Sequence, residues 1–73
     1  MRTLEEFLTE QNNRIKEMPS ECQLNERRKL YDWINTYEAA RQLEYGNNVL
    51  EKILNARNHI HANNILIDAR RAC

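Results

Sequence analysis

Three isoleucines, Ile53, Ile60 and Ile67, recur at a strict seven-residue spacing in the last third of the chain. Seven residues make nearly two helical turns, so such a repeat keeps one row of side chains facing the same partner helix. A second row beside the isoleucines carries polar groups, Arg57 and Asn64. We therefore predict a coiled-coil seam formed by Ile53, Arg57, Ile60, Asn64 and Ile67, facing another helix or a second copy of the chain. The alternative is that Arg57 extends along the surface with its charge in water and that Asn64 faces solvent.

The size and composition of the chain also favour helices. A domain of 73 residues hides only about 60% of the surface that its unfolded form exposes, so its own core is thin. With 41% apolar residues, one glycine and one proline, stability has to come from regular helices, from a covalent or metal crosslink, or from a second copy of the chain. We expect a single all-α domain spanning residues 1–73, and we expect it to gain stability by forming a homodimer.

Local signals divide the first part of the chain into two helices. Thr3 and Glu6 have the spacing of a capping box, in which each residue satisfies a free backbone N–H of the other at a helix start. Pro19 ends this first helix, because proline lacks the N–H and disfavours a helical residue before it. Ser20 and Gln23 repeat the capping-box spacing, and Gly46 is a residue that commonly follows a helix. The second helix is predicted over residues 21–45.

A third helix is predicted over residues 48–72, with Asn47 or Asn48 as its cap. Asn63 and Asn64 are poor helix formers, but Ile60 and Ile67 stay in phase across them, so we expect the helix to continue. A short connection between two long helices normally produces an antiparallel hairpin. The expected architecture is a three-helix bundle in which this long hairpin packs against the shorter N-terminal helix.

The predicted hairpin gathers positive charge at one end. It places the start of the second helix beside the end of the third, and the basic residues that meet there are Arg27, Arg28, Lys29, Arg70 and Arg71. Such a basic patch suits a phosphate backbone or an acidic protein face. The alternative is a solvated helix end that the acidic N-terminal helix covers.

Aromatic side chains on the second helix are candidates for a protein interface. Its apolar residues cover a wider arc than one neighbouring helix requires. Tyr31, Trp33 and Tyr45 are the aromatic residues concerned, and aromatic residues dominate interface energetics when they are partly uncovered. The alternative is that the N-terminal helix covers them.

Residues 39–54 resemble the helix-turn-helix of Fis-type DNA-binding proteins. That pattern has alanines and leucines at its packing positions, which here are Ala39, Ala40, Leu43, Leu50 and Leu54. The resemblance implies that major-groove contacts would come from Asn47, Asn48, Lys52 and Asn55. Two residues depart from the pattern: Glu44 occupies the position of the usual turn glycine, and Glu51 would face phosphate.

Enzyme, metal and membrane functions have no support in the sequence. No catalytic arrangement or glycine-rich phosphate loop is present, and we expect no sizeable pocket, no cofactor and no small-molecule substrate. His59 and His61 point in different directions on a helix, so they do not form a metal site. Cys22 and Cys73 do not form a dense disulfide framework, which favours free thiols and a cytoplasmic location. No apolar stretch approaches the length of a membrane span.

These features together predict a small, non-enzymatic regulatory or inhibitory protein that binds a larger macromolecule through its helix faces. A protein partner is expected. Nucleic acid is the alternative partner, through the helix-turn-helix-like segment of residues 39–54. A structural subunit of a larger assembly is the third interpretation.

Overall fold

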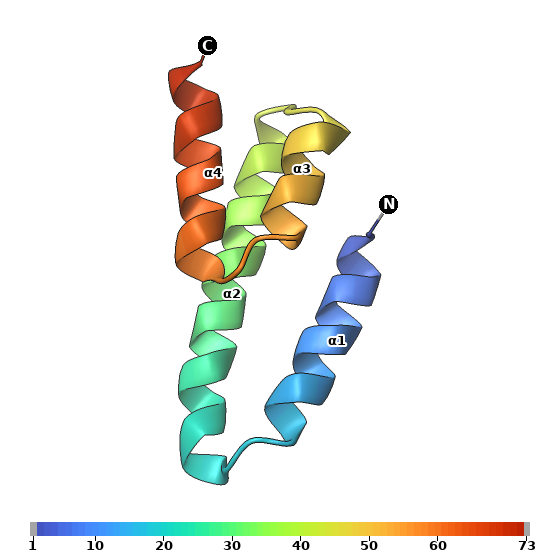
Figure 1. The fold of residues 1–73 in the computed structure, drawn as a ribbon, viewed down its shortest axis with the longest axis vertical. Coiled ribbons are helices and arrows are strands. Elements are labelled where there is room, and N and C mark those ends of the chain that lie inside the picture. The colour runs from blue at the N-terminus through green and yellow to red at the C-terminus, as the bar shows by residue number, and fades with distance from the viewer. Residues whose placement is uncertain (1, 73) are drawn as a thin grey trace.

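The computed structural model describes residues 2–72, and it confirms the all-α fold. Within this range the chain forms four helices and no strand: α1 (Leu4–Lys16), α2 (Ser20–Gln42), α3 (Asn47–Leu54) and α4 (His59–Arg71). The molecule is elongated, with extents of 42 × 21 × 18 Å, and α2 runs along its length (Figure 1). The other three helices pack around α2, so α2 is the central element of the fold.

The start of α1 follows its sequence signal, whereas the start of α2 does not. The Thr3 hydroxyl oxygen accepts the Glu6 backbone N–H at 3.1 Å, which confirms the first cap. At α2 the predicted capping box is wrong, because Ser20 already lies inside the helix and Pro19 is the residue before it. Gln23 instead donates its side-chain N–H to the Met18 carbonyl at 2.9 Å, which ties the first turn of α2 to the end of the α1–α2 connection.

The turn after α2 is closed by the backbone. Glu44 has a φ of 62°, and the N–H groups of Glu44 and Tyr45 donate to the carbonyls of Arg41 and Ala40 at 3.0 and 3.2 Å. This is the double hydrogen bond of a Schellman motif, in which a left-handed residue ends the helix. The prediction that Gly46 would be that residue is wrong: Gly46 has a φ of −70° and precedes the first turn of α3.

The predicted third helix is in fact two helices, separated at residues 55–58. Asn58 ends the continuity, because its side-chain oxygen accepts the His61 N–H at 2.8 Å and so caps a new helix, α4. The Arg57 N–H donates to Nδ1 of His61 at 3.1 Å, which holds the same turn from the other side. The three-helix bundle with a continuous helix over residues 48–72 is therefore corrected to a four-helix arrangement.

After this break α4 turns back and runs beside the C-terminal half of α2, so that its C-terminal end lies near the α2–α3 turn (Figure 1). Asn63 joins the two helices: its side-chain N–H donates to Oδ2 of Asp32 at 2.9 Å, and its side-chain oxygen accepts from the buried hydroxyl of Thr36. These contacts satisfy the Asn63 amide, which explains why α4 continues through a residue that is a poor helix former. The predicted long antiparallel hairpin is replaced by a short α2–α3 hairpin with α4 returning along α2.

The core is centred on Trp33, where α1, α2 and α3 meet. The Phe7 ring meets the Trp33 ring edge-on, with 4.8 Å between the ring centroids. The Trp33 indole N–H donates to the Ile53 carbonyl at 2.7 Å, which satisfies this buried polar group. The buried apolar residues are Phe7, Ile15, Leu30, Trp33, Ala40, Ile53, Leu54 and Ala62. Trp33 therefore fixes both α1 and α3 against α2.

Candidate functional site

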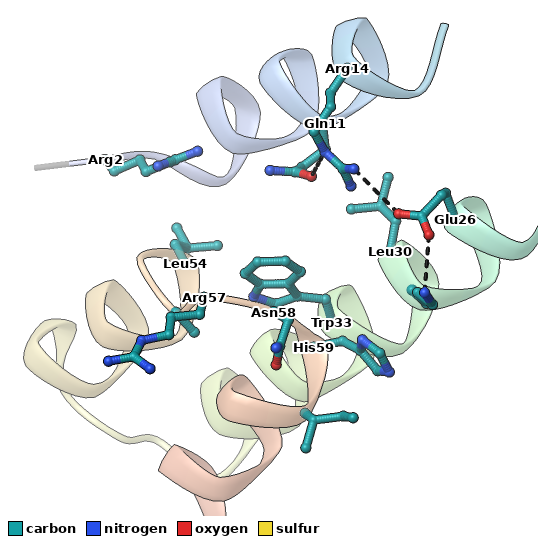
Figure 2. A pocket seen from close by; sticks show the side chains of 13 residues that line it. Arg2, Gln11, Arg14, Glu26, Leu30, Trp33, Leu54, Arg57, Asn58 and His59 are labelled. Carbon is teal, nitrogen blue, oxygen red and sulfur yellow. Dashed lines mark hydrogen bonds and ion pairs between the residues drawn. The ribbon is translucent and has the colours of Figure 1, made fainter. Parts of the chain in front are cut away.

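A cleft of about 540 Å³ opens where α1, α2 and the turn at residues 55–58 approach one another (Figure 2). Its walls include side chains from α1, α2, the end of α3 and the start of α4. The expectation that so small a bundle has no sizeable pocket is therefore wrong. The break in the predicted third helix is the reason, because the 55–58 turn and the first turn of α4 provide one side of the cleft.

The floor of the cleft is apolar and rigidly held. Leu30, Trp33 and Leu54 line it, and all three belong to the buried core. The Trp33 ring is fixed at its edge by Phe7 and at its indole N–H by the Ile53 carbonyl. Because these contacts hold the ring in one orientation, the floor needs little rearrangement to receive a ligand.

One wall of the cleft carries a carboxylate shared by two cations (Figure 2). Glu26 accepts from Nζ of Lys29 at 3.0 Å and from Nη1 of Arg14 at 3.3 Å. The hydrogen bond from Lys29 and that from Arg14 lower the pKa of the Glu26 carboxyl below its ordinary value, against the opposing effect of burial. The Gln11 side-chain oxygen also accepts from Nε of Arg14 at 3.0 Å, so the guanidinium is held over the cleft from two sides.

Further positive groups line the other parts of the cleft. The Arg2 guanidinium lies 5.5 Å from the centroid of the Phe7 ring and forms an ion pair with Glu10. Arg57 belongs to the 55–58 turn, and in Figure 2 its guanidinium points away from the Trp33 ring. His59 is the first residue of α4, so the positive end of that helix dipole also borders the cleft.

The predicted seam residues do not form one row within the chain. Ile53 is fully buried in α3, but 60% of Ile60 and 46% of Ile67 are exposed on α4. Arg57 lies in the turn between the two helices, and Asn64 is exposed on α4. These residues do not form a seam within one chain, because the break at residues 55–58 divides the helix that would carry them into α3 and α4. Contact of Ile60 and Ile67 with a second copy stays a prediction.

The predicted basic patch is divided between two ends of the molecule. Arg27, Arg28 and Lys29 lie in the N-terminal part of α2, whereas Arg70 and Arg71 lie at the end of α4, near the α2–α3 turn (Figure 1). The structure does not bring the two groups together, because α4 runs in the direction opposite to that expected. Lys29 contributes instead to the cleft.

The three aromatic candidates lie in different environments. Tyr31 is 63% exposed on α2 and remains a candidate for an interface, whereas Trp33 is buried and forms the cleft floor. Tyr45 is half-buried in the turn after α2. The alternative prediction was that the N-terminal helix covers these aromatic residues. This holds for Trp33, because Phe7 of α1 contacts its ring.

The helix-turn-helix-like segment of residues 39–54 covers the end of α2, the following turn and α3. The residues that would contact bases are all exposed, at or beside α3: Asn47, Asn48, Lys52 and Asn55. Ala40 and Leu54 are buried at packing positions, whereas Leu43 is 52% exposed. Glu44, at the position of the usual turn glycine, has the left-handed backbone that a glycine there would favour.

Sequence reasoning missed Arg2, Arg14 and Glu26 as members of one site. Arg14 and Glu26 lie on different helices, and no local spacing indicates that they meet. The sequence did contain one signal, which was Asn58. Asparagine is a favoured N-cap residue, and its side chain accepts the backbone N–H of the residue three positions later, here His61. Recognising that start would have placed a turn near Trp33.

Within residues 2–72 no group of three His, Cys, Asp or Glu side chains gathers as a metal site would require. Cys22 is exposed and has a free thiol, and Cys73 lies outside the described residues. No helix in the described range is long and apolar enough to cross a membrane.

Comparisons with models of protein families, with curated proteins and with solved structures found no match for this chain.

Proposed function

We propose that this chain is a small, non-enzymatic interaction protein that binds a larger protein through the outward face of α4. The observation that carries this proposal is the exposure of two large apolar side chains, Ile60 and Ile67, at 60% and 46%. They lie seven residues apart on one helix and therefore on the same face.

The chain itself does not cover this face. Ala62 is buried and Leu66 packs against the core, so the opposite side of α4 is already used for folding. Fully burying an isoleucine gains about 1.5–3 kcal/mol. Ile60 and Ile67 are 60% and 46% exposed, so about half of this gain per residue is left for a partner to supply.

The residues around Ile60 and Ile67 indicate what kind of partner fits. Asn64 is exposed between them, and Arg71, seven residues after Asn64, is exposed on the same side of the helix. A partner helix with an apolar row and an acidic residue beside Arg71 would match both features. A second copy of the chain would use the same apolar row, and this is the homodimer expected from the heptad.

The test places a photo-crosslinking amino acid at Asn64 in cells that make the protein. The proposal predicts a crosslink to one protein partner, lost when Ile60→Ser and Ile67→Ser are introduced together while the helical circular dichroism signal is kept. Asn13, exposed on α1, is the control position and should not give the same product. Equal products at both positions would contradict the proposal. Sedimentation velocity of the purified protein reports whether the partner is a second copy.

Sequence-specific DNA binding through α3 is the second candidate. It is favoured by the left-handed Glu44 in the α2–α3 turn and by the exposed polar face that holds Asn48, Lys52 and Asn55. Selection from a random duplex library should then return a defined sequence, and Asn48→Ala should weaken binding to it by about 1–3 kcal/mol. Asn25→Ala, at an exposed position on α2, is the matched control. Recovery of no preferred sequence would remove this candidate.

A further inference from the structure

We propose that the cleft over Trp33 binds a small organic anion, with its phosphate or carboxylate held by Arg14 and Lys29 and its apolar body covering Trp33 and Leu54. This binding site shares Ile60 with the α4 face proposed above for a protein partner, but Arg14, Lys29 and Trp33 belong to the cleft alone. Its volume of about 540 Å³ lies within the range of roughly 300–1,000 Å³ that is usual for ligand pockets.

The charge of the cleft differs from that of the whole chain. The chain as a whole has a formal net charge of zero. The cleft lining, in contrast, contains four basic side chains, Arg2, Arg14, Lys29 and Arg57, and one carboxylate, Glu26. Arg2 is paired with Glu10, and the Arg57 guanidinium points away from the Trp33 ring, so Arg14 and Lys29 supply the positive charge beside the floor. These two cations share the single charge of Glu26, which leaves this wall positive and raises the local concentration of anions.

Glu26 indicates where the anion would lie. Its two carboxylate oxygens are divided between Lys29 at 3.0 Å and Arg14 at 3.3 Å, so two cations share one negative charge. The Glu26 side chain is only 19% exposed, whereas those of Arg14 and Lys29 are 47% and 45% exposed. Both cations thus keep open donor positions facing solvent, and a ligand anion can occupy them.

Arg2 adds an unsatisfied donor to the same cleft. Its Nε–H is buried and has no hydrogen-bond partner among the described residues, although the other end of its guanidinium pairs with Glu10. Buried donors are normally satisfied, and exceptions often mark the site of a missing water, ion or ligand. This N–H has almost no exposed surface, so a ligand oxygen would reach it only after movement of the Arg2 side chain.

The apolar floor limits the class of ligand. A purely inorganic anion would leave the exposed apolar part of the lining, chiefly Ile60 at 60% exposure, uncovered. An uncharged aromatic compound would remove water from Arg14 and Lys29 without replacing its hydrogen bonds. An anion attached to a flat or apolar body satisfies both parts of the cleft. Because the Trp33 ring is already fixed by Phe7 and by the Ile53 carbonyl, such a body can pack without reordering the floor.

The test is a titration followed by the Trp33 indole N–H signal in nitrogen–proton NMR spectra. The chain has one tryptophan, so this signal identifies itself and reports on the cleft floor directly. The probes are phenyl phosphate, benzoate, phenol and inorganic phosphate. The proposal predicts a saturable shift with phenyl phosphate or benzoate, at concentrations where phenol and inorganic phosphate bind at least about fivefold more weakly. Tighter binding of phenyl phosphate than of benzoate assigns a phosphate ligand, and the reverse assigns a carboxylate.

Paired substitutions locate the binding in this cleft. Glu26→Gln removes the carboxylate that competes for Arg14 and Lys29, so the dissociation constant should fall about threefold to fivefold, the range expected for one exposed ion pair. Arg14→Gln should raise it by a similar factor. Glu21→Gln and Lys16→Gln make the same changes in charge at exposed positions of the same two helices and should leave binding unchanged.

Three results would overturn the proposal. The first is the absence of a saturable shift with both aromatic anions, and the second is equal affinity for phenol and phenyl phosphate, which would describe an apolar pocket with no role for charge. The third is equal effects of Glu26→Gln and Glu21→Gln, which would mean that overall charge rather than this cleft controls binding. The amide spectrum of each variant shows whether it is folded, so a change in affinity is not confused with unfolding.

Discussion

The two turns that reverse the chain on either side of α3 are held by different chemical groups. The turn at residues 43–46 is closed by backbone N–H groups and requires a left-handed backbone at Glu44. In the turn at residues 55–58 the backbone N–H groups of Asn55 and Ala56 end α3, and the side chains of Asn58 and His61 hold the start of α4. The first turn should therefore respond to substitutions that change backbone preference, and the second to substitutions that remove a side-chain hydrogen bond.

The largest expected effect is at Asn63, which holds α4 in the position that the second turn gives it. Asn63→Ala removes the hydrogen bonds to Asp32 and Thr36 and leaves polar groups unsatisfied between α2 and α4. We expect a loss of about 1–3 kcal/mol in the free energy of unfolding, measured by urea denaturation. Asn64→Ala, at the exposed neighbouring position, is the control and should change stability little. Equal losses at the two positions would contradict this packing of α4.

Removal of the Asn58 side chain tests the second turn itself. Asn58→Ala deletes the cap of α4, so the free energy of unfolding should fall by about 1 kcal/mol. Asn58→Asp keeps a capping oxygen and should restore most of that stability, because aspartate caps helices as well as asparagine does. If alanine and aspartate gave the same stability, the side-chain account of this turn would fail.

Substitution of Glu44 by glycine tests the first turn. It should raise the free energy of unfolding, whereas the substitutions at Asn63 and Asn58 should lower it. Glu44→Gly removes a Cβ from a left-handed residue, and we expect the free energy of unfolding to rise by about 0.5–1 kcal/mol. Glu44→Ala keeps the Cβ and should not give this gain. Asn55→Gly supplies the contrast at the second turn: its φ is −93°, so glycine brings no conformational advantage there and should be neutral or destabilising. A loss of stability on Glu44→Gly would contradict the comparison.

The smallest effect concerns Glu26, which belongs to neither turn and so provides a reference. The pKa of its carboxyl is lowered in the folded chain, chiefly by the hydrogen bond from Lys29. Such a group stabilises the fold at pH above its unfolded pKa of about 4.3, and this contribution disappears as pH falls through the folded value. The stability difference between the wild type and Glu26→Gln should be below about 1 kcal/mol, constant from about pH 6 to 7, and should shrink as the pH falls below the unfolded pKa. A difference that grows on acidification would contradict the pairing.

The amount of this fold that sequence could predict depends on where the signals lie. Thr3 and Pro19 act through neighbouring backbone groups, and the helix boundaries around them were predicted well. The asparagines of the last third have similar local propensities, yet Asn58 starts a helix whereas Asn63 lies inside one. Contacts of Asn63 with α2 decide this difference. A local pattern does not contain such contacts, so the direction of α4 was missed.

The candidate site depends on that missed direction. Trp33 was identified as an aromatic residue of interest, and Lys29 as part of a basic group, but each was assigned to a different surface. The cleft joins them because α1 crosses near Glu26 and because the 55–58 turn stops beside Trp33. The isoleucine spacing was read correctly as a helical row only for Ile60 and Ile67, which share α4.

The reversal of the chain at residues 55–58 is the central claim, and one distance tests it most directly. Spin labels are placed at Cys22 and at Arg71→Cys, with Cys73→Ser to leave two thiols, and their separation is measured by double electron–electron resonance. With α4 returning along α2, the labels lie near opposite ends of α2, and a rise of 1.5 Å per residue predicts a separation of roughly 30 Å. A continuous helix over residues 48–72 would instead set the two positions side by side, at the spacing of packed helices of roughly 10 Å, and that result would contradict the fold.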